Sequence, residues 1–124
     1  MSNLILHIVP ANYFNAQPAH QPYLPEAFPA DGFIHCTQQP EVMLQIAKRF
    51  YKNVTGDVLV LVIDADRITS EVKWESASHP DGTPTQPGDA NAILFPHIYG
   101  PLNREAITHI RVAVRDSAGN FLSV

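Results

Sequence analysis

The chain has 124 residues, a length that suits one domain, 1–124, with a hydrophobic core of its own. Eight basic and twelve acidic residues give a net charge of −4. This balance lacks the excess of positive charge with which proteins bind duplex DNA or an anionic membrane. A single cysteine excludes an internal disulfide and a zinc site made of several cysteines. No apolar run reaches the length of a membrane span, and the N-terminus lacks the basic start of an export signal. We therefore expect a cytoplasmic protein.

The first third of the chain predicts two strands separated by an irregular segment. Residues 4–9 (LILHIV) are rich in Leu and β-branched residues, and Pro10 ends this strand. Residues 11–30 contain four prolines, which forbid a long helix, so we expect a short helix at most and a surface loop. Gly32 then opens a second strand, 32–36.

The segment QQPEVMLQIAKRFYK predicts the main helix, over residues 40–52. Pro40 suits the first turn of a helix, and Glu41 favours the positive end of the helix dipole. Five apolar residues recur at helical spacing and predict one buried stripe: Val42, Met43, Ile46, Ala47 and Phe50.

The second half of the chain predicts further strands and no long helix. Residues 58–63 are apolar on both faces, as in a central strand that is covered on both sides. The other expected elements are strands at 71–75, 93–100 and 107–115, a polar loop at 76–91, a turn or short helix at 103–106, and a hairpin turn in DSAGN before the final FLSV. Within the last long strand we expect Ile110, Val112 and Val114 to face inward.

One main helix and about six or seven strands, without βαβ alternation, predict an α+β fold with a mostly antiparallel split sheet or half-barrel. We find no internal repeat and no boundary of a second domain. The polar loop 76–91 (SASHPDGTPTQPGDAN) is long for a compact domain, and we expect it to act as a lid over a site.

Three of the six histidines lie inside apolar strands, namely His7, His35 and His97. A lone histidine in such a place more often completes a hydrogen-bonded core, and a core network of this kind carries no function. Because histidine titrates near neutral pH, three of them in separate strands of one small sheet also fit a reactive site. Both interpretations stay open at this point. The remaining histidines are expected to be structural or exposed: His20, His79 and His109.

Two other interpretations use the same residues. Cys36 beside His35 suggests a Cys–His nucleophile, but neighbouring strand residues point to opposite faces, so we expect Cys36 to be a small buried hydrophobic residue. The three histidines can also furnish an open zinc or iron site, although no HxH or HxxxH spacing and no carboxylate accompanies them. We expect no metal and keep a histidine-lined, metal-dependent enzyme as an alternative.

The order of LHIV, YLPEAFPADGFIHCT, LVLVID, VKWE and FPHIYGPL resembles the small bacterial family known as domain of unknown function 952, from about Leu4 to Ile110. By fold, that family is similar to the ADP-ribosyltransferase-like group, which also contains the RNA 2′-phosphotransferases. The resemblance implies a split α+β sheet with an NAD-type cleft between its halves. It also implies NAD as a substrate, and a small nucleotide or an RNA end as the ligand.

The resemblance implies roles for residues of the first two strands. His7 resembles the leading cleft residue of the group, which hydrogen-bonds a ribose. The triplet His35, Cys36 and Thr37 resembles the second-strand motif, in which Thr37 supplies the hydroxyl.

The late motif FPHIYG departs from the group. It holds His97 and Tyr99 where the transferases usually bring a catalytic Glu, and the nearest substitute is Glu75, which also fits a plain surface carboxylate. The paired arginines of a 2′-phosphate pocket are missing as well.

We therefore expect a nucleotide cleft that carries out ribosyl or 2′-phosphoryl transfer, with a non-catalytic module that binds a nucleotide or metabolite as the alternative. The expected catalytic residues are His7, His35 and His97. The expected substrate-binding residues are Thr37, Tyr99, Tyr23 and Glu75.

Overall fold

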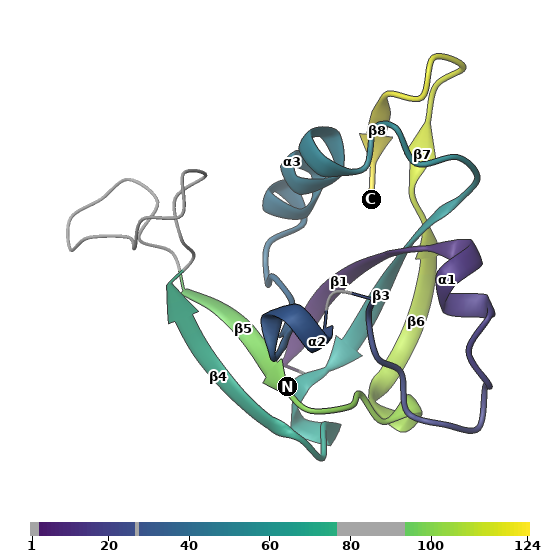
Figure 1. Cartoon of the computed structure of the whole chain (residues 1–124). Coiled ribbons are helices and arrows are strands. Elements are labelled where there is room, and N and C mark those ends of the chain that lie inside the picture. The colour runs from purple at the N-terminus through teal and green to yellow at the C-terminus, as the bar shows by residue number, and fades with distance from the viewer. Residues whose placement is uncertain (1–2, 27, 77–93) are drawn as a thin grey trace.

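The computed structural model describes residues 3–26, 28–76 and 94–124 (Figure 1). The strands are β1 (Leu4–Pro10), β2 (Ile34–His35), β3 (Val58–Asp64), β4 (Glu71–Ser76), β5 (Leu94–Tyr99), β6 (Ile107–Val112), β7 (Val114–Arg115) and β8 (Phe121–Ser123). The helices are α1 (Ala11–Asn15), α2 (Phe28–Asp31) and α3 (Pro40–Phe50), with two 3₁₀ turns, η1 (Ala65–Arg67) and η2 (Arg104–Ala106). The strand pairs described are antiparallel, so the expected mostly antiparallel α+β class is confirmed. No helix in these ranges is long and apolar enough to cross a membrane.

The first sheet has the order β1-β3-β6, with β3 at its centre (Figure 1). Alternate side chains of β3 enter two separate hydrophobic cores, one on each face of the sheet. The prediction of a central strand covered on both sides is therefore confirmed. The residues of β3 that face the first core are Leu59, Leu61 and Ile63, and those that face the second are Val58, Val60 and Val62.

The main helix, α3, packs on the second core through Met43 and Ala47. It ends at Phe50 rather than at residue 52, because Tyr51 leaves the helical conformation with φ −117° and ψ 4°. The predicted burial of Phe50 is wrong, since this residue is 67% exposed and lies along the cleft described below. Leu44 packs against the core instead.

The expectation that Ile110, Val112 and Val114 face inward is wrong. Each is about half exposed, and none belongs to either core cluster of the described residues. For Ile110 and Val112 the reason is that β6 is an edge strand, paired with β3 alone among the described strands. Their side chains lie on a sheet face, but beyond the part of that face that is covered. Val114 belongs to β7, a two-residue strand that pairs with β8. The predicted single strand divides at Ala113, which is buried and donates its N–H to the carbonyl of Val58.

The second sheet has the order β2-β5-β4, and its apolar face closes the first core. Ile34 and Ile98 lie opposite each other in this sheet and are fully buried, and Val72 packs beside them. The strand expected over residues 32–36 is only two residues long. Gly32 adopts a φ of +79°, which ends α2 and turns the chain into β2.

The Pro-rich segment forms two short helices, α1 and α2, where one at most was expected. Arg104 ties the loop between them to the rest of the fold by donating hydrogen bonds to the carbonyls of Pro18 and Gln21. The predicted hairpin turn in DSAGN is confirmed between β7 and β8, where Gly119 has a φ of +89°. The predicted lid lies almost wholly outside the described residues, which resume at Leu94.

Candidate functional site

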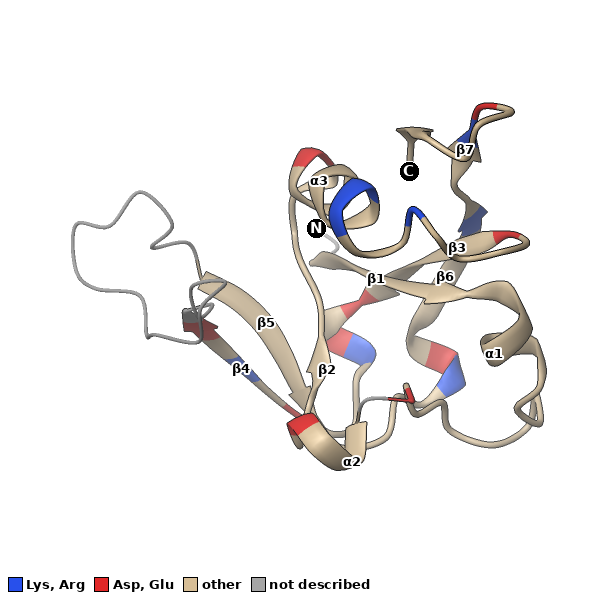
Figure 2. Cartoon of the chain, turned by 45° about the horizontal axis from the view of Figure 1, so that its top comes forward, with Lys and Arg blue, Asp and Glu red and all other residues tan. Residues whose placement is uncertain are grey.

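The polar face of the second sheet carries a row of three side chains. Antiparallel register sets His35 on β2 opposite His97 on β5, and His97 opposite Lys73 on β4. Because side chains in register share a face, this row points away from the apolar core. Acidic and basic residues alternate along β4, as Figure 2 shows in red and blue, and they put Glu71 and Glu75 on the same face as Lys73.

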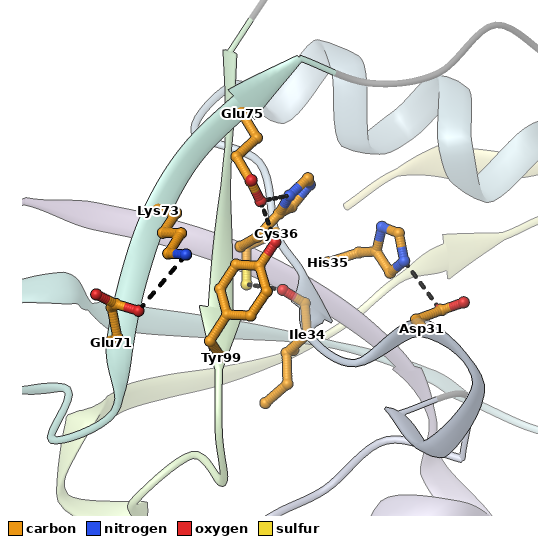
Figure 3. Close-up of polar contacts among 9 residues, drawn as sticks. Asp31, Ile34, His35, Cys36, Glu71, Lys73, Glu75 and Tyr99 are labelled. Carbon is orange, nitrogen blue, oxygen red and sulfur yellow. Dashed lines mark hydrogen bonds and ion pairs between the residues drawn. The ribbon is translucent and has the colours of Figure 1, made fainter. Parts of the chain in front are cut away.

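Glu75 joins two aromatic side chains of β5 (Figure 3). Its Oε1 accepts a hydrogen bond from Nδ1 of His97 at 2.9 Å and another from the hydroxyl of Tyr99. The hydrogen bond from Tyr99 is the main cause that lowers the pKa of Glu75, with His97 second, so the carboxylate is ionised at neutral pH. The same contact raises the pKa of Tyr99.

His97 is held as a neutral imidazole with one defined tautomer. Its side chain is only 8% exposed, and burial lowers its pKa even though the hydrogen bond to Glu75 acts in the opposite direction. The ionised carboxylate accepts, so the proton sits on Nδ1, and Nε2 keeps its lone pair. Nε2 makes no hydrogen bond to a residue within the described ranges.

A second histidine–carboxylate pair faces the first. Nε2 of His35 lies 2.9 Å from Oδ2 of Asp31, the last residue of α2 (Figure 3). The positive φ of Gly32 makes this pairing possible, because it folds α2 back over the start of β2. The side chain of His35 is 61% exposed, and its ring centroid lies 5.4 Å from that of His97 in an edge-on arrangement.

Phe33 packs against the aromatic rings of this face. Its ring stacks on His97 at 4.1 Å between centroids, and it contacts His35 at 4.6 Å and Tyr99 at 5.3 Å. The ammonium group of Lys73 lies 4.8 Å from the centre of the Tyr99 ring, which confirms that it shares the face. The two imidazoles are thus fixed in place by packing as well as by hydrogen bonds.

His7 forms a closed pair with Tyr23 inside the core. Its Nδ1–H donates to the carbonyl of His35 at 2.7 Å, and its Nε2 accepts from the hydroxyl of Tyr23 at 2.9 Å. Burial lowers the pKa of His7 to about 4, so the ring is neutral and both nitrogens are satisfied. Both residues are buried and border the cleft, and their polar atoms are already used within the fold.

Cys36 and Thr37 are also buried. Desolvation raises the pKa of the Cys36 thiol, which supports the view of this residue as a small hydrophobic side chain rather than a nucleophile. Thr37 is 2% exposed, its backbone pairs with Leu6, and its hydroxyl accepts from the N–H of Gln39. Its hydroxyl therefore serves the turn that leads into α3.

A cleft of about 940 Å³ lies between the second sheet, β1 and α3. His35 and His97 open onto it, and Phe33 and Phe95 form flat walls beside them. No lysine or arginine of the described residues lines this cleft, whereas Glu26 and Asp31 do. The remaining lining includes the α3 and α1 side chains Val42, Ile46, Phe50 and Tyr13.

The structure brings together four of the seven expected site residues: His35, His97, Tyr99 and Glu75. His7 and Tyr23 border the cleft from the core, and Thr37 is buried and is not one of the residues that line the cleft. Sequence reasoning missed three residues of the face, namely Asp31, Phe33 and Lys73. The alternation of EVKWE already placed Lys73 with Glu75, but nothing local indicated that this face meets the histidines.

No group of three or more His, Cys, Asp or Glu side chains among the described residues is arranged to hold a metal ion.

Solved structures of another protein, CC0527, have the same fold. The crystal structure of protein CC0527 from Caulobacter crescentus aligns with a TM-score of 0.74 at 22% sequence identity, over 97% of this chain and 94% of that chain. A double mutant of CC0527 gives the same values, and its solution NMR structure gives a TM-score of 0.65 at 23% identity, over 94% and 89% of the two chains. This similarity shows the fold. No curated protein matches the chain. A family model described as "Protein of unknown function (DUF952)" matches residues 8–110.

Proposed function

The chain belongs to the DUF952 family, and for this member we propose a cleft that binds a nucleotide of the NAD or ADP-ribose type and transfers its ribosyl group. The proposal includes the ADP-ribosyltransferase-like character that the sequence motifs imply. One observation carries it. The hydrogen bonds from His97 and Tyr99 bring the carboxylate of Glu75 onto the face that presents the imidazoles.

A carboxylate at this place suits the cleavage of an N-glycosidic bond. When the bond between C1′ and the nicotinamide nitrogen breaks, its electron pair leaves with nicotinamide and positive charge develops on the ribose. An ionised side chain fixed beside the ribose stabilises that charge without reorganising during the reaction. Water or an acceptor hydroxyl then forms the new bond to C1′, and its proton passes to a base such as Nε2 of His97.

The other residues of the face suit recognition of the ribose and a flat ring. His35 is exposed and presents a polar ring edge to ribose hydroxyls, while Phe33 and Phe95 supply planar walls for a base or nicotinamide. Lys73 stands at the end of the row, where it can meet a phosphate oxygen. The hydroxyls of Tyr99 and Thr37 make hydrogen bonds within the protein, so the flat ring of Tyr99 rather than its hydroxyl contributes to the binding face.

Ribosyl transfer fits this cleft better than transfer of a 2′-phosphate. A 2′-phosphate monoester is a dianion, for which paired arginines provide bidentate recognition. Within the described residues the cleft lining contains no such pair. The ribose-directed reaction needs no dianion pocket.

Nicotinamide release from NAD, followed by chromatography, tests the proposal. We expect release by the wild-type protein and a loss of at least about 100-fold in Glu75→Gln, because the stabilising charge is gone. Glu71→Gln, on the same strand and face, is the matched control and should retain the rate. Binding of NAD without release would favour a non-catalytic binding module, and no binding of NAD or ADP-ribose would contradict the proposal.

A further inference from the structure

We propose a second activity for the row His35, His97 and Lys73, namely cleavage of single-stranded RNA by attack of a ribose 2′-hydroxyl on the adjacent phosphodiester. The products are a 2′,3′-cyclic phosphate and a new 5′-hydroxyl. This inference does not rest on ribosyl transfer, because it involves no NAD and assigns no stabilising role to Glu75 at C1′.

The imidazole rings of His35 and His97 lie opposite each other, and each is hydrogen-bonded to a carboxylate. They are direct partners across the antiparallel strands β2 and β5, with ring centroids 5.4 Å apart. Each ring has one nitrogen hydrogen-bonded to a carboxylate, at 2.9 Å in both cases, through Nδ1 in His97 and Nε2 in His35. The other nitrogen of each ring has no hydrogen-bond partner among the residues that the structure describes. Two histidines held in this way offer two proton-transfer positions to one phosphodiester.

The environments of the two rings assign the roles. His97 is buried and neutral, so its free Nε2 acts as the general base. His35 is exposed, and Asp31 already holds its Nε2, so Nδ1 is the position of this ring that acts as the general acid. Nε2 of His97 takes the proton of the 2′-hydroxyl, and the 2′-oxygen forms a bond to phosphorus. The bond from phosphorus to the 5′-oxygen breaks, and that oxygen takes the proton from His35.

Lys73 completes the row on the other side of His97. Its side chain is half exposed, and its ammonium group lies 3.8 Å from Glu71 in a surface ion pair, which is weak enough for the group to turn toward a phosphate. A phosphodiester carries one negative charge, and its transition state gains a second that a single ammonium group can stabilise. Phe33 and Tyr99, beside the imidazoles, provide planar surfaces on which an unpaired base can stack.

The charge distribution points to a single strand rather than a duplex. The chain has a net charge of −4, and the described residues that line the cleft include no lysine or arginine. Binding through many phosphates is therefore disfavoured, whereas one phosphodiester at the histidine row with an unstacked base is compatible with this face. The carboxylates Asp31 and Glu75 each accept a hydrogen bond from one nitrogen of a histidine, and the phosphodiester meets the other nitrogen of each ring.

The test uses a short single-stranded oligoribonucleotide with a fluorescent label, in the presence of EDTA, and an all-deoxy oligonucleotide of the same sequence. We expect cleavage of the RNA alone and a product that ends in a 2′,3′-cyclic phosphate. His35→Ala should lower the rate at least about 100-fold, and Lys73→Ala about tenfold or more. Because His35 and Lys73 are both more than half exposed, neither substitution should disturb the fold, which circular dichroism verifies.

His109→Ala, an exposed histidine on β6, is the matched control and should cleave at the wild-type rate. A bell-shaped dependence of the rate on pH is expected for the wild type, since one imidazole must be neutral and the other protonated. No cleavage by the wild type would overturn the inference. Equal cleavage by His35→Ala and wild type, purified in the same way, would assign the activity to a contaminating nuclease and would also overturn it. Cleavage without nicotinamide release would contradict the ribosyl proposal alone.

Discussion

His35 and His97 lie directly opposite each other across the pair β2 and β5, and each is anchored to a carboxylate from a different neighbouring element. Asp31 comes from the short helix before β2, and Glu75 comes from β4 on the far side of the sheet. The pair is thus fixed by the register of three strands and one turn. This arrangement gives the polar face of the small sheet a defined chemistry, while its other face closes the first core.

The first prediction concerns the titration of His97. Glu75→Gln removes a carboxylate whose hydrogen bond and charge both raise the pKa of His97, so this pKa should fall further below its ordinary value. An NMR titration of the imidazole protons measures it. In the control Glu71→Gln the pKa should stay within a few tenths of the wild-type value. An unchanged pKa in Glu75→Gln would mean that the pair does not form in solution.

The second prediction concerns the buried pair of His7 and Tyr23. Tyr23→Phe removes the hydroxyl that donates to Nε2 of His7 and leaves that buried nitrogen without a donor. We expect the free energy of unfolding to fall by about 1–3 kcal/mol, measured by urea denaturation. Tyr13→Phe is the control, since Tyr13 is only partly buried and should change stability by less than about 0.5 kcal/mol. Equal effects of the two substitutions would contradict this role for the hydroxyl.

The third prediction is a pH dependence of stability that depends on His7. Its pKa is about 4 in the folded protein and near 6.5 in the unfolded chain, so the unfolded state takes up the proton first as the pH falls. The stabilisation is fully present above pH 6.5 and is lost progressively down to about pH 4, by up to about 3 kcal/mol. In His7→Gln this part of the slope should disappear. A variant with the same loss between these pH values as the wild type would rule out His7 as its source.

The fourth prediction concerns Arg115, which fastens the C-terminal hairpin to the turn after α3. Its guanidinium group donates hydrogen bonds to the carbonyls of Lys52, Val54, Gly56 and Gly119. Arg115→Lys cannot reach all of these acceptors at once, so we expect a loss of about 1–3 kcal/mol in the free energy of unfolding.

Arg111→Lys, at an exposed position on β6, is the matched control for Arg115→Lys. It should change the free energy of unfolding by less than about 0.5 kcal/mol. A comparable loss in both variants would show that the carbonyl contacts of Arg115 contribute little.

Much of the secondary structure was predictable because the signals are local. Three features depend on a few neighbouring residues each: the strand β3, which is apolar on both faces, the start of α3 at Pro40, and the turn in DSAGN. The exposed side chains of Ile110 and Val112 were not predictable, because alternation shows which residues share a face but not whether that face is covered.

The site was only partly predictable for the same reason. The motifs singled out His35 and His97, but their opposition depends on the register between two strands about sixty residues apart in the chain. The partnership of His97 with Glu75 depends on a third strand. His7 also lies in an apolar strand, but both of its nitrogens are hydrogen-bonded inside the core. The sequence could not distinguish these cases, because it does not show whether a buried nitrogen finds a partner.

The most direct test of the central claim, that the histidine-bearing face binds a ribose nucleotide, is isothermal titration calorimetry with ADP-ribose. We predict measurable binding to the wild-type protein, a dissociation constant raised at least about tenfold in His35→Ala, and an unchanged constant in His109→Ala. No binding to the folded wild-type protein, or equal affinity in His35→Ala, would contradict the account.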